Sequence, residues 1–253
     1  MPAPHNPLKA ALARGDVQRG LWLGLGSAAV AELASRCGFD WCLIDAEHGP
    51  NDLQRIQAQL QAMNGAPAAP VVRVPVGEDW VLKQVLDLGA QSVLVPMIDT
   101  VEQAEAAVAA VRYPPHGRRG MGAALARASG YNAIADYSVN SNAEICLMVQ
   151  AESRLAIDNI DGISAVEGVD VVFIGPADLS ADMGYPGRPD APEVLDAIDH
   201  AIARIRAAGK APGIIAFDLA EQSRYIDKGV QFLGVGADVT SLAAALKALA
   251  GGR

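Results

Sequence analysis

The sequence of 253 residues is poor in cysteine and has no excess of positive charge. Its three cysteines, Cys37, Cys42 and Cys146, are odd in number and show no Cys-x-x-Cys spacing. A disulfide framework is therefore not expected, and this use of cysteine is typical of the reducing cytoplasm. The net charge of −9 leaves no basic stripe to neutralise phosphates, so we expect no nucleic-acid partner.

Long apolar runs and nucleotide-binding motifs are also missing. No apolar stretch approaches the roughly 18 residues that a membrane span needs, and residues 1–6 lack the charged and then apolar pattern of a secretion signal. We therefore expect a cytoplasmic protein without a membrane partner. Neither a Gly-x-Gly-x-x-Gly after the first expected strand nor a P-loop occurs, so a nucleotide cofactor is not expected.

What the sequence does contain is an alternation of short apolar runs and longer amphipathic segments. This pattern is typical of repeated β-then-α units around a parallel sheet. The length and the 51% hydrophobic content suit one barrel-sized domain over residues 1–253. We predict an α/β fold, a single (β/α)8 TIM barrel, with strands at Gly20–Leu25, Trp41–Asp45, Val71–Val74, Ser92–Pro96, Ile145–Gln150, Val171–Ile174, Gly213–Ala216 and Phe232–Val235.

The segments between the expected strands differ in regularity. Asp52–Met63 and Pro192–Ala208 carry apolar residues on one helical face and are expected as outer helices. Residues 113–143 are rich in proline and glycine and are expected as a long functional loop. A C-terminal helix is expected at about Thr240–Leu249, and the sequence leaves open whether it packs on its own barrel or on that of a neighbour.

Polar residues gather at the ends of four expected strands. The C-terminal ends of the strands of a TIM barrel form its catalytic mouth, so these side chains are expected to converge there. The polar residues concerned are Asp45, Glu47 and His48 at the end of strand two, Arg73 in strand three, Gln150 and Glu152 at strand five, and Asp178 in the segment Gly175-Pro176-Ala177-Asp178 after strand six.

Glu152 and Asp178 are the expected metal ligands. Two carboxylates on neighbouring strands suit a hard divalent cation, such as Mg²⁺ or Mn²⁺, that keeps water or substrate oxygens in its shell. The alternative for each residue is structural, because Asp178 can cap a helix that starts at Leu179 and Glu152 can pair with Arg154. Their joint position at the mouth favours the metal site.

His48 and Arg73 are the expected catalytic side chains. His48 follows Asp45 by three residues, so that carboxylate can fix the imidazole tautomer of a base that works near neutral pH. Arg73 lies inside an apolar strand, where an unpaired charge is costly unless it meets an anion such as a substrate oxyanion. The alternative partner for Arg73 is Glu47 or Asp45, and such an ion pair is compatible with catalysis.

The five lysines, at positions 9, 83, 210, 228 and 247, bear on how the site could activate a carbonyl substrate, through a lysine imine or through a metal. None of them falls at the end of an expected strand. An imine mechanism therefore lacks a placed nucleophile, and polarisation of the carbonyl by a metal is the simpler hypothesis.

With these motifs in place, the sequence resembles the class II, metal-dependent pyruvate aldolases of the 4-hydroxy-2-oxoheptanedioate aldolase family, which includes 2-keto-3-deoxy-sugar-acid aldolases. The resemblance covers nearly the whole chain. It rests on residues 39–41, 45–48, 73–75, 95–97 and 112–115, and above all on Ala124-Leu125-Ala126-Arg127-Ala128-Ser129 and Phe173-Ile174-Gly175-Pro176-Ala177-Asp178-Leu179-Ser180.

The resemblance implies reversible aldol cleavage of 4-hydroxy-2-oxo acids to pyruvate, or a hydroxypyruvate-like donor, and an aldehyde. It implies that Glu152 and Asp178 hold Mg²⁺, Mn²⁺ or Co²⁺, that Arg73 stabilises the enolate, and that His48, oriented by Asp45, is the base. Gln150, Gly175 and Ala177 are implied to line the substrate site, the last through the start of a short helix. Glu47, Asp87 and Arg127 are implied as further site residues, with Asp87 reaching the site of a neighbour in a homo-hexamer of two trimers.

Two other functions remain open at this point. Gly234-Val235-Gly236-Ala237-Asp238 resembles a glycine-lined anion site, which favours a phosphate-handling barrel isomerase or synthase. A barrel kept only as a binding module is the other, since a fold alone does not establish a function. The phosphate-handling hypothesis does not account for Glu152 together with Asp178. The binding-module hypothesis predicts a broken site, whereas every matched mouth position keeps a chemically competent residue.

Overall fold

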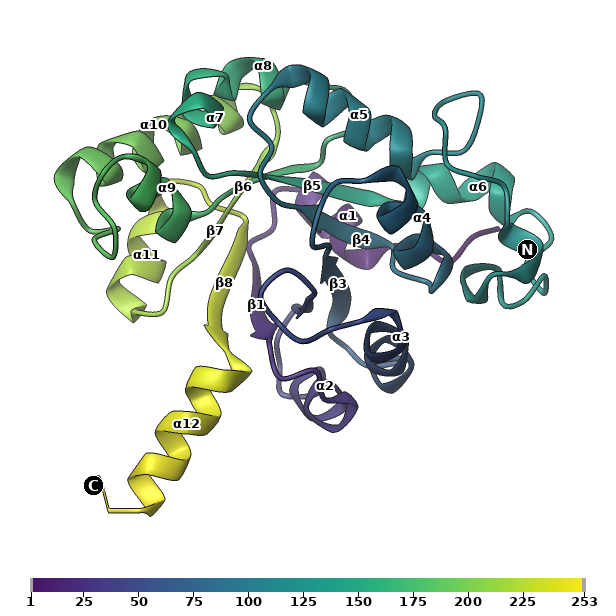
Figure 1. Ribbon diagram of the computed structural model, residues 1–253, viewed down its shortest axis with the longest axis horizontal. Helices are drawn as coiled ribbons and strands as arrows, with labels where there is room; N and C mark the ends of the chain where they lie inside the picture. The colour runs from purple at the N-terminus through teal and green to yellow at the C-terminus, as the bar shows by residue number, and fades with distance from the viewer. Residues whose placement is uncertain (1, 252–253) are drawn as a thin grey trace.

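The protein is a closed barrel of eight parallel strands, as Figure 1 shows for a computed structural model that describes residues 2–251. Each strand pairs with the next along the chain, and β8 closes the ring against β1. The predicted (β/α)8 TIM barrel is confirmed. The strands are β1 (Gln18–Leu23), β2 (Trp41–Asp45), β3 (Ala69–Arg73), β4 (Ser92–Val95), β5 (Cys146–Ala151), β6 (Val171–Ile174), β7 (Ala211–Ile215) and β8 (Phe232–Ala237).

Helices alternate with these strands and surround them. The α-helices are α1 (Pro7–Ala13), α2 (Ala28–Ala34), α3 (Leu53–Ala62), α4 (Asp79–Asp87), α5 (Val101–Val111), α6 (Tyr137–Glu144), α7 (Arg154–Asp158), α8 (Ile160–Ala165), α9 (Pro176–Asp182), α10 (Pro192–Ala207), α11 (Leu219–Asp227) and α12 (Asp238–Leu249). Two short 3-10 helices, η1 (Ala123–Leu125) and η2 (Arg127–Ser129), lie between α5 and α6. No helix within residues 2–251 combines the length and apolar character needed to cross a bilayer.

The first strand lies two residues earlier than the sequence indicates. It was expected at Gly20–Leu25 and is observed at Gln18–Leu23, where Gln18 and Arg19 pair with β8. The backbone N–H groups of Gly24 and Leu25 donate instead to the carboxylate of Asp238, at 2.9 and 3.1 Å. This side chain therefore ends β1 and ties it to the start of α12.

The long segment of residues 113–143 is more regular than expected, because its last part forms most of α6 and two turns are 3-10. Arg119 fixes the segment to the barrel. Its buried guanidinium lies 4.4 Å from the ring centroid of Tyr113 and 2.6 Å from a carboxylate oxygen of Asp87 in α4. A cation held by an aromatic face and a carboxylate accounts for the fixed position of this glycine-rich chain.

Aromatic side chains fill the inside of the barrel. Trp41 stacks on Phe232 with ring centroids 4.0 Å apart, and Trp22 lies 5.5 Å from both Trp41 and Phe173. Gly234 leaves room for this packing, because a Cβ atom there would lie 2.6 Å from the Trp22 ring. Leucines of α1 join the same cluster from the N-terminal end of the strands, so the lumen is packed and closed at that end.

The last helix, α12, projects away from the barrel (Figure 1, yellow). After its buried first residue, Asp238, the described residues of α12 are exposed, including Leu242 at 47% and Leu246 at 55%. The sequence left open whether this helix packs on its own barrel. The structure answers that part of the question, since α12 does not cover its own barrel.

Candidate active site

The C-terminal ends of the strands surround a cavity of about 470 Å³. One side of it is polar and the other is largely apolar. Its lining includes most of the predicted residues and several that the sequence did not single out. These are His48, Arg73, Gln150, Gly175, Ala177 and Asp178 from the prediction, and Trp22, Phe173, Ile215, Glu221 and Tyr225 in addition.

Arg73 is buried and held by two carboxylates. Its Nε and Nη2 donate to the two oxygens of Asp45 at 2.9 and 2.7 Å, and Nη1 lies 2.9 Å from Glu47. Asp45 and Arg73 are register partners of β2 and β3, which sets them side by side. The expected ion pair is therefore present. A guanidinium has five N–H groups, so three contacts leave two for a substrate oxygen in the cavity.

His48 is oriented differently from the sequence prediction. Asp45 accepts the backbone N–H of His48, at 3.3 Å, while Glu47 is the carboxylate near the ring, 3.9 Å from Nε2. The structure thus places Asp45 against Arg73 and the His48 backbone rather than against the imidazole. A three-residue spacing brings two residues together but does not select the atoms that meet. The imidazole is largely exposed and lines the cavity.

Glu152 is a buried carboxylate among other carboxylates. Burial raises its pKa to about 7, and the charges of Asp178 and Glu47 act in the same direction, whereas the Met97 N–H and Gln150 lower it. The N–H of Met97 donates to it at 2.9 Å, and Met97 adopts a φ of 57°, in the left-handed region that non-glycine residues rarely occupy. Such strain is typical of positions where the backbone has a function.

Gln150 and Gly175 complete the surroundings of Glu152. The Gln150 amide donates to the Glu152 carboxylate, and its own buried oxygen has no partner among the described residues. A Cβ atom at Gly175 would lie 2.5 Å from Glu152 Oε2, so only glycine leaves this carboxylate in place. The motif after β6 therefore contributes a glycine that leaves room for Glu152, in addition to the predicted ligand Asp178.

The structural alternatives for the two predicted ligands are not observed. The helix after β6 begins at Pro176 and has no side-chain cap, and Asp178 lies in its first turn. The Arg154 backbone N–H and guanidinium bond Asp182 and Met183 rather than Glu152.

The donor set fits a divalent cation that retains water. Within residues 2–251 no group of three or more histidine, cysteine, aspartate or glutamate side chains is arranged around a metal position. Two carboxylates with an otherwise open shell are the arrangement that Mg²⁺ uses at substrate sites. The unmatched negative charge around buried Glu152 and the unpartnered oxygen of Gln150 are consistent with a cation there.

Comparisons with known proteins support the same interpretation of the site. The family model described as HpcH/HpaI aldolase/citrate lyase matches residues 18–245. The chain belongs to this family. A hydroxypyruvate/pyruvate aldolase of Agrobacterium fabrum is 58% identical over 98% of this chain and 94% of its own length, and a 4-hydroxy-2-oxo-heptane-1,7-dioate aldolase of Shigella sonnei is 53% identical over 97% and 94%. A crystal structure of a family protein from Burkholderia cenocepacia superposes with a TM-score of 0.94 at 39% identity, covering 96% of this chain and 97% of that one.

HpcH/HpaI aldolases are class II lyases that depend on a divalent metal. The lysines of this family member agree with that chemistry, since none of the five lines the mouth cavity. The phosphate-site alternative is not favoured. Its glycines lie within β8, where Gly234 packs on Trp22, and the carboxylate of Asp238 already binds the neighbouring N–H groups.

Five of the predicted site residues of the aldolase do not line the mouth cavity. Asp45, Glu47 and Glu152 contact its lining residues Arg73 and Gln150, whereas Asp87 and Arg127 have other partners. Asp87 ends α4 and pairs with Arg119, while Arg127 donates to the Leu88 carbonyl at 2.7 Å. Both lie outside the mouth cavity of their own subunit.

Sequence reasoning missed three residues of the wall that β7 and α11 give to the mouth. Ile215, Glu221 and Tyr225 lie there beside Phe217. The available signal was position, because Ile215 ends a strand and Phe217 follows it. Neither residue carries obvious chemistry by itself, and Glu221 lies in a helix turn that the strand-end rule does not reach.

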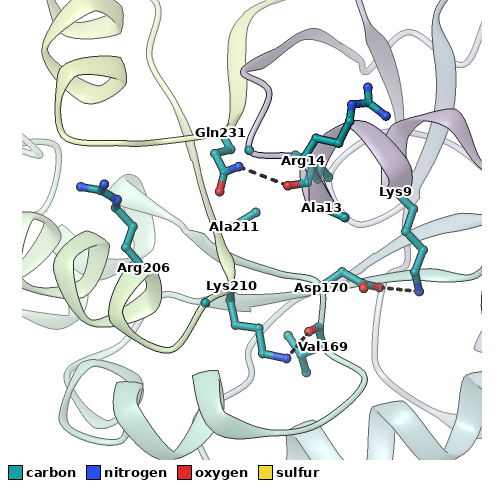
Figure 2. Close-up of a pocket in the computed structure, with 12 residues that line it drawn as sticks. Lys9, Ala13, Arg14, Val169, Asp170, Arg206, Lys210, Ala211 and Gln231 are labelled. Atoms are coloured by element: carbon teal, nitrogen blue, oxygen red, sulfur yellow. Dashed lines mark hydrogen bonds and ion pairs between the residues drawn. The ribbon is translucent and has the colours of Figure 1, made fainter.

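A second cavity, also of about 470 Å³, lies at the opposite end of the barrel (Figure 2). Its cations already have partners. Lys9 pairs with Asp170 and Lys210 donates to the Val169 carbonyl, at 3.2 and 2.8 Å, and the helices α1 and α10 end beside it. Arg206 lies in the last turn of α10, where a cation offsets the partial negative charge of the last carbonyls, and it donates to the Lys228 carbonyl at 3.0 Å. These cations therefore make structural contacts at this end of the barrel.

Proposed function

We propose that this protein cleaves 4-hydroxy-2-oxo acids to pyruvate, or a hydroxypyruvate-like compound, and an aldehyde, and that it also runs the reaction in reverse. The observation that carries the proposal is a cavity lined by Arg73, His48 and Asp178, with buried Glu152 hydrogen-bonded to the lining residue Gln150, in a chain from this aldolase family. The names of the two relatives add support, because both describe aldolases of 2-oxo acids.

Glu152 and Asp178 would hold the divalent cation, for which we propose Mg²⁺, Mn²⁺ or Co²⁺. When bound, the cation supplies a Lewis acid that lowers the energy of the enolate. Gln150 stands beside Glu152 and lies within the cavity, where its amide helps to orient the donor. Because Gly175 and Ala177 are small, the pyruvate part of the substrate can approach the start of α9.

His48 would accept the proton of the C4 hydroxyl, and Arg73 would stabilise the negative charge of the enolate. The imidazole of His48 removes the proton of the C4 hydroxyl, directly or through a water molecule. The C3–C4 bond then breaks, a carbonyl forms at C4, and the electron pair of the bond becomes the enolate over C2 and C3. Arg73 stabilises the enolate oxygen with its two remaining N–H groups, and return of the proton to C3 gives the methyl group of pyruvate.

The test is release of pyruvate from 4-hydroxy-2-oxo acids by the purified protein, before and after chelation of metals. We expect release that chelation abolishes and that Mg²⁺, Mn²⁺ or Co²⁺, added back one at a time, restores. Release that resists chelation would indicate a lysine imine instead. Failure to release pyruvate from a panel of short substrates with any of the three ions would refute the proposed activity.

We further propose that the enzyme is a homo-hexamer of two trimers in the cytoplasm. Two observations support assembly. The exposed residues Val239, Leu242, Leu246 and Leu249 recur at helical spacing and share one face of α12. Asp87, which lies away from its own mouth, is then available to that of a neighbouring subunit. The oligomeric state is measured by light scattering on the eluting protein.

A further inference from the structure

The wall of the mouth cavity that β7 and α11 form differs in chemistry from the wall that holds Arg73. It presents apolar Ile215 and Phe217 and the buried ring of Tyr225. Glu221 is the ionisable carboxylate on this wall. The donor end, with Glu152, Gln150 and Arg73, lies at β3 and β5, so the β7 and α11 wall is left to the aldehyde.

Glu221 is held in position by the start of its helix. Asp218 caps α11 by accepting the N–H groups of Ala220 and Glu221, at 2.8 and 3.3 Å. Among the described residues no lysine or arginine forms an ion pair with Glu221. The pKa of Tyr225 is raised mainly by burial and further by the negative charge of Glu221, which fits the position of both residues on one wall.

Among the described residues that line the cavity, no unpaired lysine or arginine balances this charge. Arg73 is the arginine in the cavity lining, and Asp45 and Glu47 hold it from the other side. Glu221 is exposed, so an aldehyde that carries its own carboxylate would meet it at the rim of the cavity, where like charges repel and salt weakens the repulsion.

We propose that Glu221, with the apolar side chains beside it, makes this enzyme select acceptor aldehydes without a carboxylate. The inference rests on the proposed aldolase function and adds the substrate class. It separates this chain from the relative named for a heptanedioate substrate, because cleavage of such a diacid between C3 and C4 leaves a four-carbon aldehyde with a terminal carboxylate. Neutral aldehydes, including hydroxylated ones, fit the wall.

The experiment compares two acceptors with the same chain, charged 4-oxobutanoate and its neutral methyl ester, in condensation with pyruvate and metal. We expect the wild-type kcat/KM for the ester to exceed that for the acid by about tenfold or more. Glu221→Lys should reduce this ratio by about tenfold, and Glu221→Gln should give an intermediate value. High salt should lower the wild-type ratio because it screens exposed charge.

Asp227→Lys is the matched control, because it makes the same charge change at the exposed end of the same helix and outside the cavity. Equal kcat/KM for the two acceptors in the wild type would overturn the inference. The inference would also be overturned if Asp227→Lys changed the ratio of kcat/KM for ester and acid as much as Glu221→Lys does. Both results leave the aldolase activity in place, whereas an absence of condensation with every aldehyde would count against the proposed function itself.

Discussion

Replacement of Arg73 by alanine tests the chemistry of the mouth most directly. Arg73 is 7% exposed and joins Asp45 and Glu47 through three contacts of 2.7 to 2.9 Å. Loss of one partner of a buried ion pair costs about 3–5 kcal/mol. Asp45 keeps the backbone N–H groups of Glu47 and His48, at 3.1 and 3.3 Å, so we expect the lower end of that range. A domain stable by about 5–15 kcal/mol is then expected to remain folded.

The effect on activity should be larger than the effect on stability. Loss of one donor to a developing oxyanion lowers the rate by about 10²–10³. Because Arg73 acts on the enolate, both pyruvate release and metal-promoted exchange of the pyruvate methyl protons for deuterium should fall. Arg73→Lys keeps the charge but loses the two-pronged contact with Asp45, so partial recovery is expected.

Nuclear magnetic resonance follows the exchange, a coupled assay follows the release of pyruvate, and thermal unfolding shows whether the variants are folded. Exchange by folded Arg73→Ala within about threefold of the wild type would refute the assignment of this side chain to the enolate, since the expected loss is far greater.

Three further outcomes follow from the described contacts. His48→Ala should slow aldol cleavage by about 10²–10⁴ while proton exchange at pyruvate falls less, and equal losses in the two assays would contradict its role at the C4 hydroxyl. Gly175→Ala should weaken metal binding at least about tenfold, because its Cβ would lie 2.5 Å from Glu152 Oε2; a titration of activity against Mn²⁺ measures this, and an unchanged midpoint would speak against Glu152 as a ligand. Leu242→Glu should reduce the size of the assembly in light scattering, while Ala244→Glu, on the other face of α12, should not; identical elution of both variants at the wild-type size would exclude the apolar face as an interface.

The sequence predicted the barrel because alternation between period-two and helical segments is a local property. Trp41–Asp45 and Val171–Ile174 are observed with the predicted limits. The first strand was displaced because a side chain more than 200 residues away, Asp238, takes the N–H groups of Gly24 and Leu25. A partner so distant in the chain cannot be identified from a local pattern.

The location of the candidate site could be predicted because the strand ends of a barrel meet at one rim. The contacts between its side chains could not be predicted. Asp45 is three residues from His48 in sequence, yet the register of β2 and β3 places it opposite Arg73. Glu221 was missed because it lies in the first turn of α11, where the same residue type commonly serves only the helix dipole.

The aromatic packing inside the barrel closes the mouth cavity at its inner end. Trp22, Trp41, Phe173 and Phe232 block any passage toward the cavity at the other end, so substrate and products share one opening. Under the proposed assignment the aldehyde would lie beside exposed Phe217 and pyruvate beside buried Gln150. With the inner end closed by four side chains, we expect the aldehyde to leave before pyruvate.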